Sequence, residues 1–460
     1  MAVENSSTEY IAKVIEAQRH YFRSGVTLDI AFRKQMLQHL LDALHKWEKP
    51  LAEALWHDLH KSYEEAYMTE FGILYGEIGN HIKHLSSWAA PKKVASSLKM
   101  FPSRSKVVSE PLGNTLIIAP WNYPVQLLIN PLIGAISAGC TALLKPSPYT
   151  PNVAQVLEQM IDDTFSEEYI AIVQGNRDVN RYLLEQRFDL IFFTGSPVLG
   201  REVMAAAAKH LTPVVLELGG KSPCIVDKEA DIKVAAKRIA WGKSLNAGQT
   251  CIAPDYLLVH EDIKEEFIEA LQKAFRSLLG RKPHKTKHFV RIVSDRAFDR
   301  LVAYLDNGAI RFGGEYDKDE RLIVPTLLDS VSPSAPVMQE EIFGPIFPLL
   351  TFSDTEDAIK FVTEREKPLA LYYFGSTEKG EEVLSRTSSG GACLNDVIMH
   401  IANENTPFGG VGNSGMGSYH GEESFRTFSH RKTIVSTTTR WDVPFRYMPY
   451  RLFSLIKRLM

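Results

Sequence analysis

One cysteine at the centre of a loop-like stretch is the residue of this sequence best suited to nucleophilic chemistry. Cys251 lies in "NAGQTCIAPD", where a preceding glycine and a following proline disfavour the interior of a helix or strand. A partly ionised thiol in an exposed loop can attack a carbonyl carbon, although a free cysteine is more often a small buried hydrophobic residue. Cys140, Cys224 and Cys393 border apolar, strand-like runs, and we expect them in the core.

A carboxylate at the end of an apolar run allows three interpretations. Glu217, in "VVLELGGKS", follows a glycine turn at Gly195 by about 20 residues. In an ordinary dinucleotide-binding fold this position holds the carboxylate that binds the ribose. A carboxylate beside two glycines could equally be a general base with a raised pKa, and the third interpretation is a solvated strand end. The residues alone leave these three open.

Two further polar side chains could contact a substrate or a cofactor. Asn122, in "PWNYP", stands between aromatic residues and prolines, where a rigid turn can hold a side-chain N–H against a developing oxyanion. A packed aromatic turn without chemistry explains the same motif. Lys145, in "LLKPSP", follows an apolar run, so its ammonium could meet ribose or phosphate oxygens or extend into solvent like other surface lysines.

A glycine turn that leads into a helix is a candidate phosphate site. In "DLIFFTGSPVLGREV" an apolar strand ends at Gly195, with Ser196 at the N-cap position and Pro197 in the first helical turn. Backbone N–H groups and the helix dipole favour an anion there. Gly200 comes five residues after Gly195, so the stretch lacks the full Gly-x-Gly-x-x-Gly pattern, and a structural turn remains equally consistent.

The elements that must position these residues change type along the chain. Between residues 8 and about 90, apolar residues recur at three- and four-residue intervals, which predicts helices. Short strands follow from about residue 105, and Gly113-Asn114 predicts a hairpin between "KVVSEP" and "TLIIAPW". Apolar runs then alternate with helical patterns, which predicts βαβ units and an α/β fold. The β-branched run "RKTIVSTTTR" could pair at a sheet edge or across a subunit interface.

The composition narrows the class of protein. The chain has 460 residues, 45% of them hydrophobic, and a formal net charge of -3, so no nucleic-acid partner is predicted. Its four cysteines are widely spaced, which disfavours a disulfide framework and a structural zinc site, and no metal site is indicated. We find no signal peptide and no apolar run of roughly 18 residues, and we expect a cytoplasmic location.

Taken together, these segments resemble the aldehyde dehydrogenase family. "PWNYP", "KPS", "FTGS", "LELGGKSP", "NAGQTCIAP" and "EEIFGP" occur in the family's order, and the stretch from "GGACLNDVIMH" to "FSHRK" resembles the class 3, fatty-aldehyde-type branch. The resemblance covers about residues 5 to 440. It implies a Rossmann-like NAD(P)-binding domain, an α/β catalytic domain and a small β oligomerisation element. The corresponding segments are 1–84 with 104–217, 218–400, and 85–103 with 401–440, followed by an amphipathic tail at 441–460.

The resemblance also implies a role for each candidate residue. Cys251 would attack the aldehyde, the Asn122 side chain and the Cys251 N–H would hold the oxyanion, and Glu217 would activate the water that hydrolyses the thioester. The overall reaction would oxidise an aldehyde to a carboxylic acid while a hydride passes to NAD(P). The implied cofactor residues are Glu341 at the nicotinamide ribose, Phe343 near the ring, Gly195, Ser196 and Gly200 near the pyrophosphate, and Lys145 at the adenosine ribose.

Two features bear on specificity. Many relatives have an acidic residue three places after the lysine that corresponds to Lys145, where the present sequence has Pro148. Loss of that carboxylate removes a ribose acceptor and a charge that would repel the 2′-phosphate, so we expect NADP to be tolerated. By motif, the residues of an apolar tunnel for medium- or long-chain aliphatic or aromatic aldehydes would be Tyr123, Trp241, Thr250, Phe408 and, less directly, Tyr75.

Two alternative functions stay open at this point. A coenzyme A-acylating enzyme would use a thiol in place of water, but such enzymes can do without the base that Glu217 would supply. A non-catalytic family member would not need all the catalytic residue types that the chain retains. Class 3 resemblance implies a homodimer. In the tail, an apolar stripe would pack on the protein or make weak peripheral contact with a membrane; its residues are Leu452, Leu455, Ile456 and Leu459.

Overall fold

The computed structural model describes residues 4–97, 100–440, 442, 447–450, 453, 454 and 457. The chain begins with helices, which confirms the prediction for residues 8 to about 90. Ser7 and Asp29 cap the two long helices, because their side chains accept hydrogen bonds from backbone N–H groups of the first turn. The elements are α1 (Thr8–Arg23), η1 (Val26–Leu28), α2 (Ile30–Leu59), α3 (Tyr63–Ala66), the π-helical turn η2 (Tyr67–Phe71) and α4 (Gly72–Ala89).

A mainly parallel sheet follows. Its elements are β3 (Asn114–Ile118), α5 (Gln126–Ala138), β4 (Thr141–Lys145), α6 (Pro151–Thr164), β5 (Ile170–Ile172), α7 (Arg177–Glu185), β6 (Leu190–Gly195), α8 (Pro197–Ala208), β7 (Val214–Leu218) and β17 (Gly415–Met416). The strand order is β17-β7-β6-β3-β4-β5, with β17 antiparallel to β7. Every residue of β3 and β4 is buried, as central parallel strands require. Helix α1 covers part of this sheet, since Ile11 and Val14 belong to the same apolar cluster as Leu116 and Leu143.

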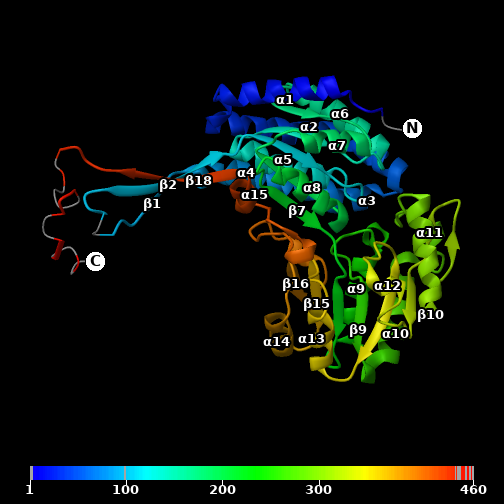
Figure 1. Cartoon of the computed structure of the whole chain (residues 1–460). Coiled ribbons are helices and arrows are strands. Elements are labelled where there is room, and N and C mark those ends of the chain that lie inside the picture. The colour runs from blue at the N-terminus through cyan, green and yellow to red at the C-terminus, as the bar shows by residue number, and fades with distance from the viewer. Residues whose placement is uncertain are drawn as a thin grey trace.

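A second sheet lies beside the first (Figure 1). Its elements are β8 (Pro223–Val226), α9 (Ile232–Ser244), η4 (Leu245–Gly248), β9 (Tyr256–His260), α10 (Lys264–Leu279), α11 (Asp295–Ala303), β10 (Ala309–Phe312), β13 (Thr326–Asp329), α12 (Pro336–Gln339), β14 (Ile346–Phe352), α13 (Thr355–Thr363), β15 (Ala370–Phe374), α14 (Thr377–Arg386) and β16 (Gly391–Leu394). The strand order is β10-β13-β14-β9-β8-β15-β16. Shorter elements are η5 (Glu261–Ile263), η6 (Pro283–Lys285), η7 (Tyr304–Asn307), β11 (Tyr316–Asp317), β12 (Leu322–Ile323), η8 (Met399–Ile401) and η9 (Gly412–Ser414). The two sheets confirm the predicted α/β class.

An antiparallel arm projects from the first sheet (Figure 1). It consists of β1 (Lys92–Val94), β2 (Arg104–Pro111) and β18 (Ser429–Ser436), with α15 (Glu422–Thr427) at its base. The hairpin predicted at Gly113-Asn114 is wrong, because β2 pairs with β1 and β18 whereas β3 pairs with β4 and β6. The uninterrupted apolar run of β3 belongs inside a parallel sheet, so the chain leaves the arm at this turn. The predicted edge pairing of the "RKTIVS" segment is confirmed by its register with β2.

The apolar stripe predicted at Leu452, Leu455, Ile456 and Leu459 lies outside the described residues. Within the part of the chain that the structure describes, no helix is long and apolar enough to span a bilayer.

Candidate active site

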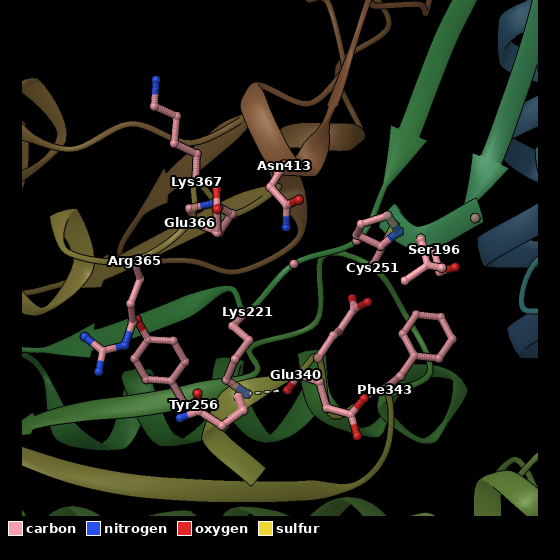
Figure 2. A pocket seen from close by; sticks show the side chains of 18 of the residues that line it. Ser196, Lys221, Cys251, Tyr256, Glu340, Phe343, Arg365, Glu366, Lys367 and Asn413 are labelled. Carbon is pink, nitrogen blue, oxygen red and sulfur yellow. Dashed lines mark hydrogen bonds between the residues drawn. The ribbon is translucent and has the colours of Figure 1, made fainter. Parts of the chain in front are cut away.

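The parallel strands of the first sheet end at a cavity of about 800 Å³ that faces the second sheet. Strands β3, β6 and β7 run in the same direction, so the segments that follow them emerge along one edge. Figure 2 shows groups from these segments and from the second sheet converging on the cavity. The predicted site residues that line it are Asn122, Gly195, Ser196, Cys251, Glu341 and Phe343.

Cys251 follows a left-handed bend between α9 and β9. Within this bend Asn246 has a φ of 49° and Gly248 a φ of 73°. A Cβ atom at Gly248 would lie 2.4 Å from the carbonyl oxygen of Gly344, so glycine is required both for the backbone angle and for the close approach. The Asn246 side chain donates to the Gln249 carbonyl at 3.0 Å and closes the bend. The nucleophile loop, residues 246–251, is therefore fixed by its own hydrogen bonds.

The thiol lies among acidic side chains and backbone donors. Burial raises the pKa of Cys251, and the nearby Glu341 and Glu217 carboxyls raise it further. The N–H groups of Cys251 and Ile252 hydrogen-bond the sulfur and oppose this rise in pKa. These N–H groups face the sulfur, so they can also meet an oxygen on a carbon that the sulfur has attacked.

Glu217 is a buried carboxyl without a partner. It lies in β7, is 3% exposed, and neither carboxyl oxygen has a hydrogen-bond partner among the described residues. Burial raises the pKa of Glu217 well above its usual value, because desolvation favours the neutral acid over the carboxylate. When it is ionised, the Glu217 carboxylate raises the pKa of the Cys251 thiol, so the two groups lie close together. Once ionised, a carboxylate in this environment is a strong base that can accept a proton from water or from the thiol.

Asn122 lies just beyond β3 and contacts the nucleophile loop. The side chain is 3% exposed, and its NH₂ donates to the Gln249 carbonyl at 3.1 Å. The backbone carbonyl of Asn122 accepts a hydrogen bond from the Asn246 side chain at 2.9 Å. An amide NH₂ has two donor hydrogens, and Gln249 is its one partner in the described part of the chain. The second hydrogen can therefore meet a substrate oxygen.

Three side chains hold the segment 340–343 that closes the opposite wall. Lys221 Nζ donates to the carbonyl of residue 340 at 2.9 Å and also pairs with Asp255. Asp255 accepts the N–H of Ile342 at 2.8 Å, and Arg300 donates to the Ile342 carbonyl at 2.8 Å. Lys221 and Glu340 face the cavity in Figure 2. Lys221 follows β7, the strand that carries Glu217, so its hydrogen bonds connect the end of the first sheet to segment 340–343 on the opposite wall.

Glu341 and Phe343 occupy this wall. Burial raises the pKa of Glu341 to about 8, while the Gly220 N–H hydrogen-bonds the carboxyl and opposes the rise. A Cβ at Gly219 would lie 2.1 Å from Glu341 Oε2, so the glycine provides the space that the carboxyl occupies. Phe343 has a φ of 52°, and its ring meets that of Trp121 edge-on at 5.4 Å. The rings form an apolar surface beside a carboxyl, as a nicotinamide riboside needs.

The glycine turn leads into α8 as predicted. Ser196 is the N-cap, and its hydroxyl accepts the Leu199 N–H at 3.4 Å. Gly195 and Ser196 line the cavity at the positive end of the helix. Gly200 is not among the described residues that line it; a Cβ there would lie 2.7 Å from the Leu218 side chain. Gly200 thus allows α8 to pack closely on β7.

Lys145 ends β4 and is 1% exposed. Its ammonium donates to the adjacent Pro146 carbonyl at 2.6 Å, and burial lowers the pKa of Lys145 to about 7. Pro148, in the turn that follows, is half-buried. A buried lysine with a single carbonyl partner is an available donor for a ribose or phosphate oxygen.

None of the predicted tunnel residues is among the described residues that line the cofactor cavity. The Tyr123 hydroxyl and Thr250 Oγ1 are 2.6 Å apart, which joins the turn after β3 to the residue before Cys251. Phe408 is buried and stacks on His400 at 5.9 Å. Trp241 is a partly buried residue of α9, the helix that precedes the loop.

Tyr75 is tied to α2. Its hydroxyl hydrogen-bonds Glu48, and its ring stacks on His45 at 4.2 Å. No described contact joins Tyr75 to the nucleophile loop.

Sequence reasoning missed the buried side chains that support this site. Lys61 and Glu70, from the N-terminal helices, contact the turn that holds Asn122. Asn246 lies within the "NAGQTCIAP" motif, but its backbone bend cannot be deduced from the residue type. Lys61 follows a helix in a stretch that contains no glycine or proline, so the local sequence does not indicate that this lysine is buried at the site.

The cavity fits a dinucleotide. Its volume is large enough for one, and the capped N-terminus of α8 faces it, where a phosphate would bind. The Glu341 carboxyl, in the space left by Gly219, and the Phe343 ring lie together on one wall. Cys251 lines the cavity, and the unpartnered Glu217 carboxyl, which is not among the described residues that line it, lies close enough to raise the pKa of the Cys251 thiol. The residues present therefore match a nicotinamide cofactor.

Two α/β sheets that meet at such a cavity define a dinucleotide-dependent oxidoreductase. The chain belongs to the aldehyde dehydrogenase family, whose model matches residues 1–434. This confirms the sequence-based predictions of the fold, of an enzyme that oxidises aldehydes to acids, and of NAD(P) as cofactor.

Relatives extend the match over nearly the whole chain. The chain is 47% identical to the 4,4'-diaponeurosporen-aldehyde dehydrogenase of Staphylococcus aureus, over 95% of this chain and 96% of that protein. It is 44% identical to the dimeric NADP-preferring aldehyde dehydrogenase of Rattus norvegicus, over 92% and 94% of the two chains. A substrate-bound structure of Staphylococcus aureus AldH superposes with a TM-score of 0.96 at 45% identity, over 98% and 99%.

Proposed function

We propose that this protein oxidises apolar aldehydes through a thioester on Cys251, which Glu217 helps water to hydrolyse. The observation that carries the proposal is a thiol and an amide donor that line a cofactor-sized cavity, with an unpartnered buried carboxyl near the thiol. Because Glu217 supplies a base for water, hydrolysis is favoured over transfer to coenzyme A.

The ionised Glu217 carboxylate takes the proton of the Cys251 thiol, the sulfur adds to the aldehyde carbon, and the carbonyl electron pair moves onto oxygen. The Asn122 NH₂ and the Cys251 N–H stabilise this oxyanion. When bound, NAD(P) supplies the hydride acceptor that oxidises the carbon attached to sulfur, leaving a thioester. Glu217 releases its proton to solvent and then takes a proton from water as the water oxygen attacks the thioester. The sulfur leaves as thiolate, and the product is the carboxylic acid.

The cofactor contacts follow from the walls of the cavity. Glu341 binds the nicotinamide ribose and Phe343 supports the ring. Ser196 and Gly195 hold phosphate at the start of α8, where Gly200 allows close packing. The absence of a carboxylate at Pro148, near Lys145, lets the site accept the 2′-phosphate of NADP, and a relative carries "NADP-preferring" in its name.

The substrate class follows from the side chains beyond the nucleophile loop. Tyr123, Trp241, Thr250 and Phe408, with Tyr75 further out, present rings and methyl groups that suit medium- or long-chain aliphatic or aromatic aldehydes. The name of the Staphylococcus aureus relative, 4,4'-diaponeurosporen-aldehyde dehydrogenase, supports an apolar substrate.

The larger organisation belongs to the same proposal. Residues 1–84 with 112–217 form the NAD(P)-binding domain, to whose sheet β17 also belongs, and 218–400 form the catalytic domain. The remainder of 85–111 and 401–440 forms the bridging element that joins two copies in a homodimer; the boundary expected at residue 104 moves to 112, because β2 pairs with β1 and β18. The relatives named dimeric support this assembly.

The deciding experiment measures NAD(P)H formation from a medium-chain aldehyde without coenzyme A, with NAD and NADP in separate runs. Cys251→Ala should abolish turnover, whereas Cys140→Ala, at a buried cysteine away from the cavity, should retain it. Turnover that begins only after coenzyme A is added would reject the hydrolytic proposal. Retained turnover in Cys251→Ala would reject the nucleophile.

A further inference from the structure

We propose that a buried ion pair between Lys61 and Glu70 is a positioning pair, which fixes the turn carrying Asn122 against the nucleophile loop. This rests on the oxyanion role proposed above for Asn122. Both charged side chains are 0% exposed, and Lys61 Nζ lies 2.6 Å from Glu70 Oε1. Neither residue is among the described residues that line the cofactor cavity.

The Lys61 ammonium has three donor hydrogens and three partners. Besides Glu70, it donates to the Asn122 carbonyl at 3.1 Å. It also lies 4.3 Å from the centre of the Tyr123 ring, where a cation is attracted by the aromatic face. Two of the three partners are therefore consecutive residues of the oxyanion turn, residues 120–124.

The second oxygen of Glu70 fixes the other end of that turn. Glu70 Oε2 accepts the N–H groups of Val125 at 2.9 Å and Gln126 at 3.2 Å. These begin α5, whose N-cap side chain makes no capping hydrogen bond. A carboxylate here satisfies helix-terminal donors and interacts favourably with the helix dipole. The ion pair thus holds the chain from Asn122 to Gln126 at both ends.

The turn that the ion pair holds is itself in contact with the nucleophile loop. The Asn122 carbonyl that accepts from Lys61 also accepts from Asn246, and the Asn122 side chain donates to Gln249. The Tyr123 hydroxyl meets Thr250, the residue before Cys251. Displacement of the turn by about 1 Å would misalign the oxyanion donor, and errors of that size cost about 100-fold in rate.

Irregular backbone next to Lys61 and at Glu70 places both charged side chains in the interior. Lys61 follows His60, which ends α2 with a φ of 56°, and Glu70 lies in the π-helical turn η2. Single π turns are frequent at functional sites. Because replacing a buried ion pair by apolar groups is often neutral for stability, the pair is better explained by the geometry it imposes than by the stability it adds.

The test is a double-mutant cycle between Lys61→Met and Asn122→Ala, measured on aldehyde oxidation. Lys61→Met should lower kcat about 10-fold to 100-fold, as expected for a displaced oxyanion donor, and change the KM for NAD(P) less than about two-fold. In the Asn122→Ala background the same substitution should have almost no further effect, because it acts through that amide. Alkylation of Cys251 by iodoacetamide should proceed at the wild-type rate.

Two further variants separate positioning from folding. Lys61→Met leaves Glu70 buried without its partner, so Lys61→Met/Glu70→Gln removes both charges; this double variant should unfold near the wild-type temperature and keep the low kcat. Lys264→Met breaks a partly buried ion pair with Asp329, of 2.8 Å, away from the cavity and should retain activity.

A wild-type kcat in Lys61→Met/Glu70→Gln would overturn the inference. So would a Lys61→Met defect that is undiminished in Asn122→Ala, since the pair would then act elsewhere. Full activity in Asn122→Ala alone would reject the oxyanion role itself, and with it this inference.

Discussion

At the scale of single residues, burial sets the protonation of both reacting groups. The pKa values of Cys251 and Glu217 are raised, chiefly by desolvation. Burial therefore favours the neutral form of both groups, and Glu217 in particular is costly to ionise inside the folded protein. This electrostatic arrangement has a measurable consequence for stability.

Glu217→Gln should stabilise the protein increasingly as the pH rises. The folded pKa lies above the ordinary value of 4.5, so above pH 4.5 the unfolded chain releases this proton while the folded chain retains it. Wild-type stability is lost from pH 4.5 upward to the folded pKa, and glutamine escapes that loss. A tenfold difference in proton affinity between the folded and unfolded chains is worth about 1.4 kcal/mol, so urea unfolding should show a gain of more than about 1 kcal/mol at about pH 8 relative to about pH 5.

The control is Glu53→Gln, at a solvent-exposed glutamate, whose stability difference from wild type should not change over this range. A Glu217→Gln difference that is constant across the same pH range would contradict a neutral Glu217 in the folded enzyme.

Pro148 is the residue that we expect to govern cofactor choice. Pro148→Glu should raise the KM for NADP at least about 10-fold, because the new carboxylate repels the 2′-phosphate, and should lower the KM for NAD by accepting hydrogen bonds from the ribose. Pro148→Gln, of matched size without charge, should leave NADP use nearly unchanged. Equal losses with both substitutions would assign the effect to the turn rather than to charge.

At the scale of elements, the sequence predicted those features that local chemistry determines. Ser196 and Pro197 predicted the start of α8, and the apolar run at Leu116 predicted a strand, although not that it would be buried inside a parallel sheet. The hairpin at Gly113 failed because turn residues do not reveal that the strands on either side enter different sheets. The left-handed Phe343 has no sequence signal, since its φ of 52° is imposed by the packing around it.

The short turn between β7 and β8 should control the cofactor wall. In Gly219→Ala the new Cβ would start 2.1 Å from Glu341 Oε2, so the carboxyl must move away from the ribose position. We expect the KM for NAD(P) to rise about 10-fold or more, with little change in the unfolding temperature, because the displaced group is one side chain. Titration of cofactor binding by tryptophan fluorescence measures the effect.

Gly280→Ala is a suitable comparison, because a Cβ there would meet nothing within 4 Å, although its φ of 75° carries some backbone strain. Cofactor affinity should be normal in that variant. Normal affinity in Gly219→Ala would show that Glu341 does not bind the cofactor from its observed position.

At the scale of the whole molecule, the projecting arm exposes much of its surface in the single chain. Strand β1 is exposed along its length, and β18 along most of it. Val94 and Val435 are 49% and 48% exposed, and both are paired in register with Ser105, so they flank it on one face of the arm. Apolar side chains on a projecting sheet suit burial against a second copy.

Val94→Asp/Val435→Asp should therefore convert a homodimer into a monomer. A dimer interface on that face would bury two carboxylates without ion-pair partners, and their desolvation costs several kcal/mol of association free energy. Sedimentation velocity should give twice the chain mass for wild type and the single chain mass for the variant. Ile310→Asp, at a 46% exposed position on β10, adds a charge elsewhere and should remain dimeric. Dimers that survive both arm substitutions would locate the interface on another face, whereas a monomeric wild type would reject the homodimer.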